Sequence, residues 1–465
     1  ETPPIVETPP VIETPPPVIE TPPIVETQEP LLPQQGERTV RLSQLLRETV
    51  APEELDLEPL LPKSADQADP VSIGFARQIR EAISRGDIAG AIAATDALRR
   101  YELAVYTQDE AAAARRDIDQ TTVERMQELV RIWEERTQQR YAILYTLAYP
   151  EHLELLLITR DNEPIRRIVP NAGQLVLSNA ASELRRAVTN PVVRGDTTRH
   201  LSSAQELYDY IIRPVSDRLE LDNIDSVIMS LSPELRSTPI AALHDGERYF
   251  VEDYNFTLLT SFDAIDSKQK LERGSRILAM GASEFTDPSQ DPLPFVPVEL
   301  ATITQKSWQG QSFLNEAFTV ENFRAQRQAD PSAIIHLATH ADFQGGSIAN
   351  SYIQFGQERV QLNKIDQLSL GNPIVNLLVL SACRTALGNA QAELGFAGLS
   401  VQSGARTAIA SLWYVDDAGT SVLMGQFYRQ WADGDIATKS AALQQAQLAM
   451  MRGHATIKNG VLRVE

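Results

Sequence analysis

The sequence has little or none of three things: cysteine, long apolar runs and basic charge. Its one cysteine, Cys383, excludes an intrachain disulfide framework but not export, because exported proteins can also lack disulfides. No run of 18 apolar residues occurs, so we expect no membrane-spanning segment. The 42 basic residues stand against 62 acidic ones, a net charge of -20. Because phosphate binding requires a basic surface, we expect no nucleic-acid partner.

The chain also begins without a methionine, and its first residues do not form a signal-peptide pattern. A processed protein and a fragment would both begin in this way. The compartment is therefore left open between the cytoplasm and export after removal of a signal peptide that precedes residue 1.

Residues 1–37 are rich in proline and repeat the sequence Glu-Thr-Pro-Pro followed by Val and Ile. Through residue 33 they hold 11 of the 28 prolines of the chain and no basic residue. Proline fixes φ and removes an amide donor, so the segment favours polyproline II and cannot build a core. We expect a disordered linker over residues 1–37. A ligand for a proline-reading domain is the alternative.

Residues 38–140 are expected to form a small helical subdomain. Apolar residues recur three and four positions apart over residues 70–84, 88–101 and 121–138, the spacing of amphipathic helices. Residues 85–87, Arg-Gly-Asp, mark a turn between the first two helices. No 34-residue period recurs, so tandem helical repeats are not predicted.

The pattern changes to strands at residue 141. Apolar runs over residues 141–147, 153–159 and 165–169 are separated by short polar turns, which is typical of an antiparallel meander. We assign residues 141–465 to one α/β domain that begins with these strands.

Two later apolar runs end in residues that carry chemistry. Residues 333–340 end in His340, and residues 377–383 end in Cys383. Short runs of this kind suit strands buried on both faces of a parallel sheet, where functional groups gather beyond the carboxyl ends. Adjacent parallel strands would place the imidazole beside the thiol and make it a nucleophilic thiolate. The sequence predicts a Cys383–His340 dyad; a small buried hydrophobe is the alternative for a lone cysteine.

A second histidine, His336, precedes His340 by four residues. On an extended chain that separation is about 13 Å, so His336 cannot share the strand end and is expected in the core. On a helix the two histidines would resemble a zinc pair. The metallopeptidase motif requires glutamate after its first histidine, however, and Leu337 stands there. No metal and no cofactor are expected.

Six segments of the chain carry a family resemblance. They read Ser232-Pro-Glu-Leu-Arg-Ser-Thr-Pro-Ile-Ala-Ala-Leu-His-Asp-Gly246, Leu278-Ala-Met-Gly-Ala-Ser-Glu284, His336-Leu-Ala-Thr-His340, Leu380-Ser-Ala-Cys-Arg-Thr-Ala-Leu-Gly388, Glu393-Leu-Gly-Phe-Ala-Gly398 and Ala410-Ser-Leu-Trp-Tyr-Val-Asp-Asp417. In this order, over about residues 140–450, they resemble a CHAT domain of the caspase and separase superfamily of cysteine peptidases. The resemblance implies an α/β fold with a caspase-like, mostly parallel sheet flanked by helices. The half that lacks a dyad of its own, the pseudo-half, would cover about residues 141–275, and the catalytic half would cover about residues 276–465.

The resemblance also implies roles for individual residues. It makes Cys383 the nucleophile and His340 the general base, with the backbone amides of Cys383 and Ala341 as the oxyanion hole. The family usually has glycine where Ala341 stands. Alanine still offers an amide donor, but it does not adopt a positive φ cheaply.

Charged residues around the predicted dyad have two interpretations each. Asp416 and Asp417 follow an apolar run, and as isolated residues they are expected to cap the helix that begins near Thr420. Resemblance to a Leu-Trp-Asp segment of separase implies instead an acidic pocket for Arg or Lys before the cut. Arg384 could lower the pKa of the thiol or order the loop by pairing with Glu393, and a plain salt bridge is the alternative.

The sequence therefore predicts a cysteine endopeptidase that acts on protein or peptide substrates without a cofactor. A partner protein that orders the loops around the cysteine is one route to its activation. A catalytically inactive protein-interaction scaffold with the same fold is the alternative, favoured by Ala341. An exported adhesin-like surface protein with a proline-rich stalk is a third hypothesis.

Overall fold

The computed structural model describes only part of the chain. The described ranges are residues 70–114, 123–190, 198–259, 261–262, 275–343, 348–381, 384–385, 404–412, 415–432, 436–458 and 461–464. The chain divides into two compact units, residues 1–55 and 56–465, and every described residue belongs to the second. The proline-rich segment 1–37 lies outside the described residues, so its expected disorder stays a prediction. The predicted boundaries of the helical subdomain and of the two halves also stay predictions.

Helices open the described part of the chain. They are α2 (Pro70–Ser84), α3 (Ile88–Thr107), α4 (Glu110–Ala113) and α5 (Val123–Thr137). Gly86, at a φ of 72°, makes the turn between α2 and α3, and Asp87 caps α3 by accepting a 2.8 Å hydrogen bond from the amide of Gly90. The helices predicted from the apolar spacing are thus confirmed, with the third beginning at Val123.

The first sheet has the strand order β3-β2-β1-β4-β5. Its strands are β1 (Tyr141–Ala148), β2 (His152–Thr159), β3 (Ile165–Pro170), β4 (Ser226–Ser230) and β5 (Asn255–Leu258). The first three strands pair antiparallel, which confirms the predicted meander. Strands β4 and β5 extend the sheet in parallel with β1.

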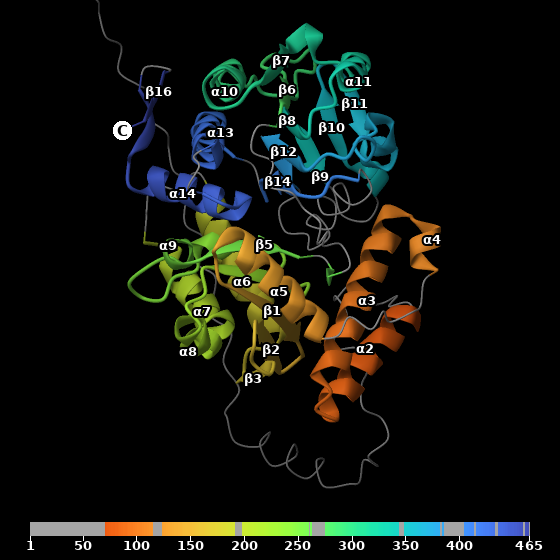
Figure 1. Cartoon of the computed structure of the whole chain (residues 1–465), viewed down its shortest axis with the longest axis vertical. Helices are drawn as coiled ribbons and strands as arrows, with labels where there is room; N and C mark the ends of the chain where they lie inside the picture. The colour runs from red at the N-terminus through yellow and green to blue at the C-terminus, as the bar shows by residue number, and fades with distance from the viewer. Residues whose placement is uncertain are drawn as a thin grey trace, which may run out of the picture. The chain divides into compact units, whose positions relative to one another are not determined.

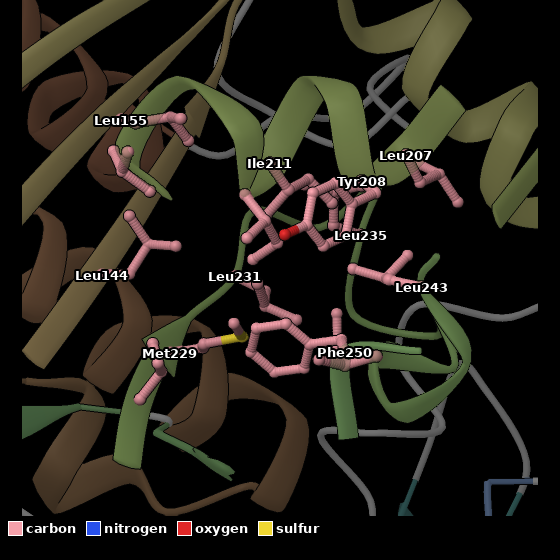
Figure 2. Close-up of a cluster of buried hydrophobic side chains, with 14 of the residues drawn as sticks. Leu144, Leu155, Leu207, Tyr208, Ile211, Met229, Leu231, Leu235, Leu243 and Phe250 are labelled. Carbon is pink, nitrogen blue, oxygen red and sulfur yellow. The ribbon is translucent and has the colours of Figure 1, made fainter. Parts of the chain in front are cut away.

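Both faces of the first sheet are buried, because side chains alternate along each strand. Leu144 packs on one face and Tyr145 on the other. The face of Leu144 is covered by apolar side chains of α7 and of the segment after β4, which Figure 2 shows around Ile211, Leu235 and Phe250. The opposite face is covered by α2, α3 and α5. The helices and short 3₁₀ turn that complete this region are α6 (Gln174–Thr189), α7 (Leu201–Ile211), α8 (Arg213–Leu221), η2 (Ile240–Ala242) and α9 (Phe250–Asp253).

The second sheet is parallel throughout and has the order β14-β12-β8-β6-β7. Its strands are β6 (Ile277–Gly281), β7 (Gly310–Leu314), β8 (Ile334–Ala338), β12 (Leu377–Ser381) and β14 (Ala408–Ala410). A parallel sheet flanked by helices is the α/β fold that the sequence predicts, and the prediction is confirmed. Strand β6, the first in chain order, has β7 on one side and β8 on the other. Such a switch point is where open α/β sheets bind their ligands, outside the carboxyl ends of the strands.

Helices cover both faces of the second sheet (Figure 1). One face packs on α10 (Val296–Thr302), α13 (Asp417–Ala432) and α14 (Lys439–Met451) through Ala279, Ile334 and Val379. The other face contributes Leu278, Ile335 and Leu380 to a core with Phe323 of α11 (Val320–Ala329) and Phe355 of β10. None of the helices in the described part of the chain is long and apolar enough to cross a membrane.

Smaller elements complete the described structure. A third sheet has the order β11-β10-β9-β13, in which β9 pairs antiparallel with β10 and parallel with β13. A terminal hairpin, β15–β16, was not predicted from the sequence. These elements and the remaining short turns are η4 (Ile303–Ser307), η5 (Asn315–Ala317), β9 (Ala341–Phe343), η6 (Ile348–Asn350), β10 (Tyr352–Phe355), β11 (Glu358–Gln361), η7 (Leu362–Leu368), β13 (Arg384–Thr385), β15 (Ala455–Lys458) and β16 (Val461–Val464).

Candidate active site

The strands that lead to the predicted dyad lie side by side. Strands β8 and β12 pair in parallel, and Ala338 faces Ser381 at their carboxyl ends. The amide of Thr339 donates a 3.1 Å hydrogen bond to the carbonyl of Ser381. His340 follows Ala338 by two positions, and Cys383 follows Ser381 by the same number. Cys383 itself lies outside the described residues, but the predicted parallel neighbourhood of the two strands is confirmed.

The two chain segments pair again beyond the predicted dyad. Asp342 of β9 faces Arg384 of β13 in a parallel arrangement. His340 therefore falls between Ala338 and Asp342, while Cys383 falls between the partners of those two residues, Ser381 and Arg384. The described residues on either side of the two candidates are therefore paired with one another.

His340 is held in one orientation by its surroundings. Its Nε2 lies 2.7 Å from the carbonyl oxygen of Asp291, and its ring centroid lies 4.6 Å from that of Phe285, at an interplanar angle of 47°. A carbonyl oxygen only accepts hydrogen bonds, so Nε2 carries the proton of the neutral imidazole. Nδ1 is then the unprotonated nitrogen that can act as a base.

The loop that contains Asp291 follows β6 at the switch point and is anchored along its length. The amide of Leu293 donates to the carbonyl of Ser283 at 3.0 Å. The side chain of Gln290 donates to that of Gln354 at 3.0 Å. Hydrogen bonds on both sides of Asp291 therefore support the carbonyl that orients His340.

Ala341, the predicted second oxyanion donor, lies in β9 with 1% of its surface exposed. The carbonyl of the preceding residue, His340, accepts a 2.9 Å hydrogen bond from the amide of Gln354 in β10. Across a trans peptide the following N–H points the opposite way, so the Ala341 amide points to the side of β9 where β13 pairs. Ala341 is not one of the residues in the described ranges that have a positive φ. An alanine is accommodated here without the strain that a left-handed backbone would cause.

The two aspartates after β14 have different surroundings. Asp416 is exposed and accepts a 2.7 Å hydrogen bond from the amide of Gly419, which caps the start of α13. Asp417 is half-buried and accepts a 2.8 Å hydrogen bond from the amide of Phe295. Burial raises the pKa of Asp417 to about 6, helped by the negative charges of Glu299 and Asp416 and opposed by the Phe295 hydrogen bond. The helix that the sequence predicted from Thr420 begins at Asp417.

The expected supporting pair is only partly placed. Glu393 lies outside the described residues. The backbone of Arg384 forms β13 with Thr385, next to β9. The pairing of Arg384 with Glu393 therefore stays a prediction.

His336 is a core histidine, as predicted. It is fully buried, its Nε2 lies 2.9 Å from Glu299 Oε1, and its Nδ1 lies 3.3 Å from the hydroxyl of Tyr428. Burial raises the pKa of Tyr428 well above its usual value, and the negative charge of Glu299 acts in the same direction. Among the residues that the structure describes, no group of three His, Cys, Asp or Glu side chains could hold a metal ion.

Sequence reasoning missed the partners of both histidines. Glu299 lies on α10, which interrupts the apolar pattern with a single buried carboxylate. Asp291 acts through its backbone carbonyl, for which a sequence carries no signal. Phe295, which links the Asp291 loop to Asp417, also acts through its backbone.

Comparison with known proteins gives a family match and remote structural likenesses. A family model, the CHAT domain, matches residues 201–459. No curated protein matches the sequence. A solved chain from the Saccharomyces cerevisiae separase–securin complex is similar, with 9% identity and a TM-score of 0.46 over 81% of this chain. The match covers 34% of that chain, so the present chain spans about a third of its length. The family match begins later than the resemblance assigned from residue 140.

Proposed function

The chain belongs to the CHAT domain family, and on that premise we propose that it is a cysteine endopeptidase that hydrolyses protein or peptide substrates. Cys383 is the nucleophile and His340 the general base. The register of β8 with β12 carries the proposal, since both residues stand two positions beyond the paired residues Ala338 and Ser381.

The chemistry begins with proton transfer from the Cys383 thiol to His340. The hydrogen bond from Nε2 to the carbonyl of Asp291 leaves Nδ1 as the accepting nitrogen. The resulting thiolate attacks the carbonyl carbon of the scissile peptide and forms a carbon–sulfur bond. The electron pair of the carbonyl moves to oxygen, and the amides of Ala341 and Cys383 donate hydrogen bonds to that oxyanion.

The second half of the cycle returns the enzyme to its starting state. The carbon–nitrogen bond breaks as imidazolium His340 gives its proton to the departing amine. A water molecule then attacks the thioester while His340 accepts its proton. The carbon–sulfur bond breaks, the carboxylic acid product leaves, and the proton returns to the Cys383 sulfur. All atoms come from the substrate, water and these two side chains, so the reaction as written uses no cofactor.

Three charged residues are assigned supporting roles. Arg384 follows the nucleophile directly, and its positive charge, ordered by Glu393, favours the thiolate. The exposed carboxylate of Asp416 follows β14, the neighbour of β12, by six positions in the chain, and it is assigned the role of favouring a basic residue before the cut. A partner protein that orders the loops around Cys383 is the proposed activator.

A protein-interaction scaffold with the same fold is the second candidate function. The sequence feature that favours a scaffold is Ala341, because the family usually has glycine there. The Ala341 amide points toward the β13 side of β9, so the alanine still offers a donor on the side where the proposed nucleophile would lie. The argument for a scaffold is weaker for that reason. The enzyme is therefore the better supported of the two.

The proposal is tested by digestion of a mixed peptide library, read by mass spectrometry. Wild type, Cys383→Ala and His340→Ala are compared, with His454→Gln, at an exposed residue, as a matched histidine control outside the site. We expect new peptide ends only with wild type and with the control. Equal cleavage by the Cys383→Ala protein would assign the activity to another group, and binding without cleavage by wild type would favour the scaffold.

A further inference from the structure

The segment from Asp291 to Phe295 connects two hydrogen bonds that come from distant parts of the chain. At one end, the carbonyl of Asp291 accepts the Nε2 proton of His340 at 2.7 Å. At the other end, the amide of Phe295 donates to the carboxylate of Asp417 at 2.8 Å. Only three residues separate the two, so a shift of Phe295 is transmitted over a short stretch of backbone to the atom that orients the imidazole.

The far side of this segment is fixed in the core. Phe295 precedes α10, and its carbonyl accepts the amide of Glu299 at 2.9 Å. Glu299, with 1% of its surface exposed, reaches the buried His336 at 2.9 Å. The start of α10 is thus held on two sides, by the sheet through Glu299 and by α13 through Asp417. The segment that precedes α10 and contains Asp291 is therefore attached to a fixed helix end.

We propose that Asp417 is a positioning residue for His340, acting through Phe295 and the Asp291 carbonyl, and not a group that recognises the side chain of the substrate. This rests on the proposed function in that it concerns the same general base. The carboxylate of Asp417 is half-buried and bonded to a backbone amide. Asp416, one residue earlier, is the exposed carboxylate of the two.

The surroundings of Asp417 disfavour its negative charge, which fits a carboxylate held inside the fold by the Phe295 amide. Burial raises its pKa to about 6, and the carboxylates of Glu299 on α10 and Asp416 on its own segment act in the same direction. The Phe295 amide opposes the shift. A neutral carboxyl group is a weaker acceptor than a carboxylate, so the anchor weakens as the pH falls through about 6.

Two substitutions separate positioning from substrate recognition. Asp417→Asn keeps an acceptor oxygen for the Phe295 amide but removes the charge, whereas Asp417→Ala removes both. For positioning we expect Asp417→Ala to lower kcat about tenfold with little change in KM, equally for substrates with a basic or a neutral residue before the cut. Asp417→Asn should recover most of this loss. Thr438→Ala, which removes the cap of α14 at Ala441, is the control for the loss of a helix-terminal hydrogen bond elsewhere.

Recognition of a basic side chain predicts the opposite pattern. Asp417→Asn would then be as impaired as Asp417→Ala, the effect would fall on KM, and it would be confined to substrates with Arg or Lys before the cut. That result, or wild-type kcat in Asp417→Ala, would overturn the proposal.

A readout independent of turnover keeps this inference separate from the proposed function. Nitrogen-15 spectra of the imidazole report which nitrogen of His340 carries the proton. We expect Nε2–H in wild type and in Asp417→Asn, and a mixture of tautomers in Asp417→Ala. A wild type that cleaves nothing but gives these spectra would contradict the peptidase assignment and leave the positioning role intact.

The same spectra serve if Asp417→Ala does not fold. Phe295→Pro then removes the amide that Asp417 accepts and leaves the carboxylate in place, and it should give the same mixture of tautomers. Nε2–H alone in Phe295→Pro would overturn the proposal.

Discussion

The segment that follows β4 in the first sheet and the segment that follows β8 in the second sheet hold their charged and polar side chains differently. In the first sheet the segment after β4 contains Arg236, which pairs with Glu102 of α3, and Arg99 of the same helix lies 3.4 Å from that carboxylate. These side chains are between 7% and 12% exposed. In the second sheet the segment after β8 contains His340, which is only partly buried and has a single hydrogen bond in the described structure from its ring to a backbone carbonyl.

This difference separates groups that hold the fold from groups that are available for chemistry. At the end of β4 the charges of Arg99, Glu102 and Arg236 pair with one another and are buried by a helix, although Arg99 Nε and Glu102 Oε1 have no hydrogen-bond partner among the described residues. Removing one member of such a buried group leaves the others unpaired, so the group acts on stability. At the end of β8 the imidazole of His340 keeps one nitrogen without a proton, because Nε2 donates to the carbonyl of Asp291. A catalytic site needs a polar side chain that is held in one orientation and still has an atom available to react.

The largest effect should come from substitution of the two proposed catalytic residues beyond β8 and β12. Cys383→Ala or His340→Ala should lower kcat/KM by about 10³-fold or more, because the nucleophile and its base act as one unit. Thermal unfolding of both variants should stay within a few degrees of wild type, since His340 is partly exposed. Peptide cleavage and calorimetry check the two halves of this prediction. A double variant much slower than either single variant would show that the two residues act independently.

Removal of the buried histidine should act on stability. His336→Ala leaves the carboxylate of Glu299 buried without its 2.9 Å partner, at a cost of about 3 kcal/mol in the free energy of unfolding. Urea unfolding measures the loss. Tyr428→Phe, which removes only the hydroxyl near Nδ1, should cost about 1 kcal/mol. Equal losses in both variants would contradict the dominant role of the Glu299 contact.

Removal of a buried charge at the end of β4 should also lower the stability, but less strongly. Arg236→Ala should cost about 2 kcal/mol, because Glu102 keeps Arg99 as a partner. Arg236→Lys restores the charge but not the planar guanidinium and should recover part of the loss. Chemical denaturation gives both values. If Arg236→Ala changed kcat while leaving stability intact, the contrast between the two segments would be lost.

Asp417 should give stability a recognisable pH dependence. Its pKa is raised from 3.8 to about 6 in the folded protein, so the folded state binds the proton more tightly than the unfolded state. The stability that this gives is complete below pH 3.8 and is lost as the pH rises through about 6. Asp417→Asn does not titrate, so its melting temperature should exceed that of wild type above pH 6, with a difference that shrinks toward pH 4. A difference independent of pH would contradict the raised pKa.

The smallest effect should come from the exposed cap. Asp416→Ala removes the acceptor for the Gly419 amide and should destabilise the protein by about 1 kcal/mol. Asp416→Ser, with a shorter capping side chain, should recover most of that loss. Urea unfolding measures it, and cleavage of paired Arg and Leu substrates shows separately whether the carboxylate contributes to specificity. A destabilisation of the size expected for His336→Ala would mean that Asp416 has contacts beyond the cap.

The sequence predicted most of the elements that position the site. Unbroken apolar runs before His340 and Cys383 indicated adjacent parallel strands, and the structure has β8 and β12 in that arrangement. The strands themselves end at Ala338 and Ser381, before the predicted ends at His340 and Cys383. Strand ends are set by hydrogen bonding to neighbours, which an apolar pattern does not record.

The contacts that orient the side chains were beyond the sequence. Glu299 meets His336 and Phe295 meets Asp417 only because α10 and α13 pack on the same face of the second sheet. The carbonyl of Asp291 is identical in chemistry to every other backbone carbonyl, so only its position gives it a role. Such contacts depend on tertiary packing between segments far apart in the chain.

The central claim, that His340 activates Cys383, is tested most directly by labelling with an electrophilic peptide probe that has Arg or Lys at the cleavage position. Wild type, His340→Ala and urea-denatured wild type are compared by mass spectrometry of the peptide that contains Cys383. The account predicts rapid labelling of native wild type and slow labelling of the other two samples. Labelling at the rate of an ordinary thiol in all three samples would contradict it.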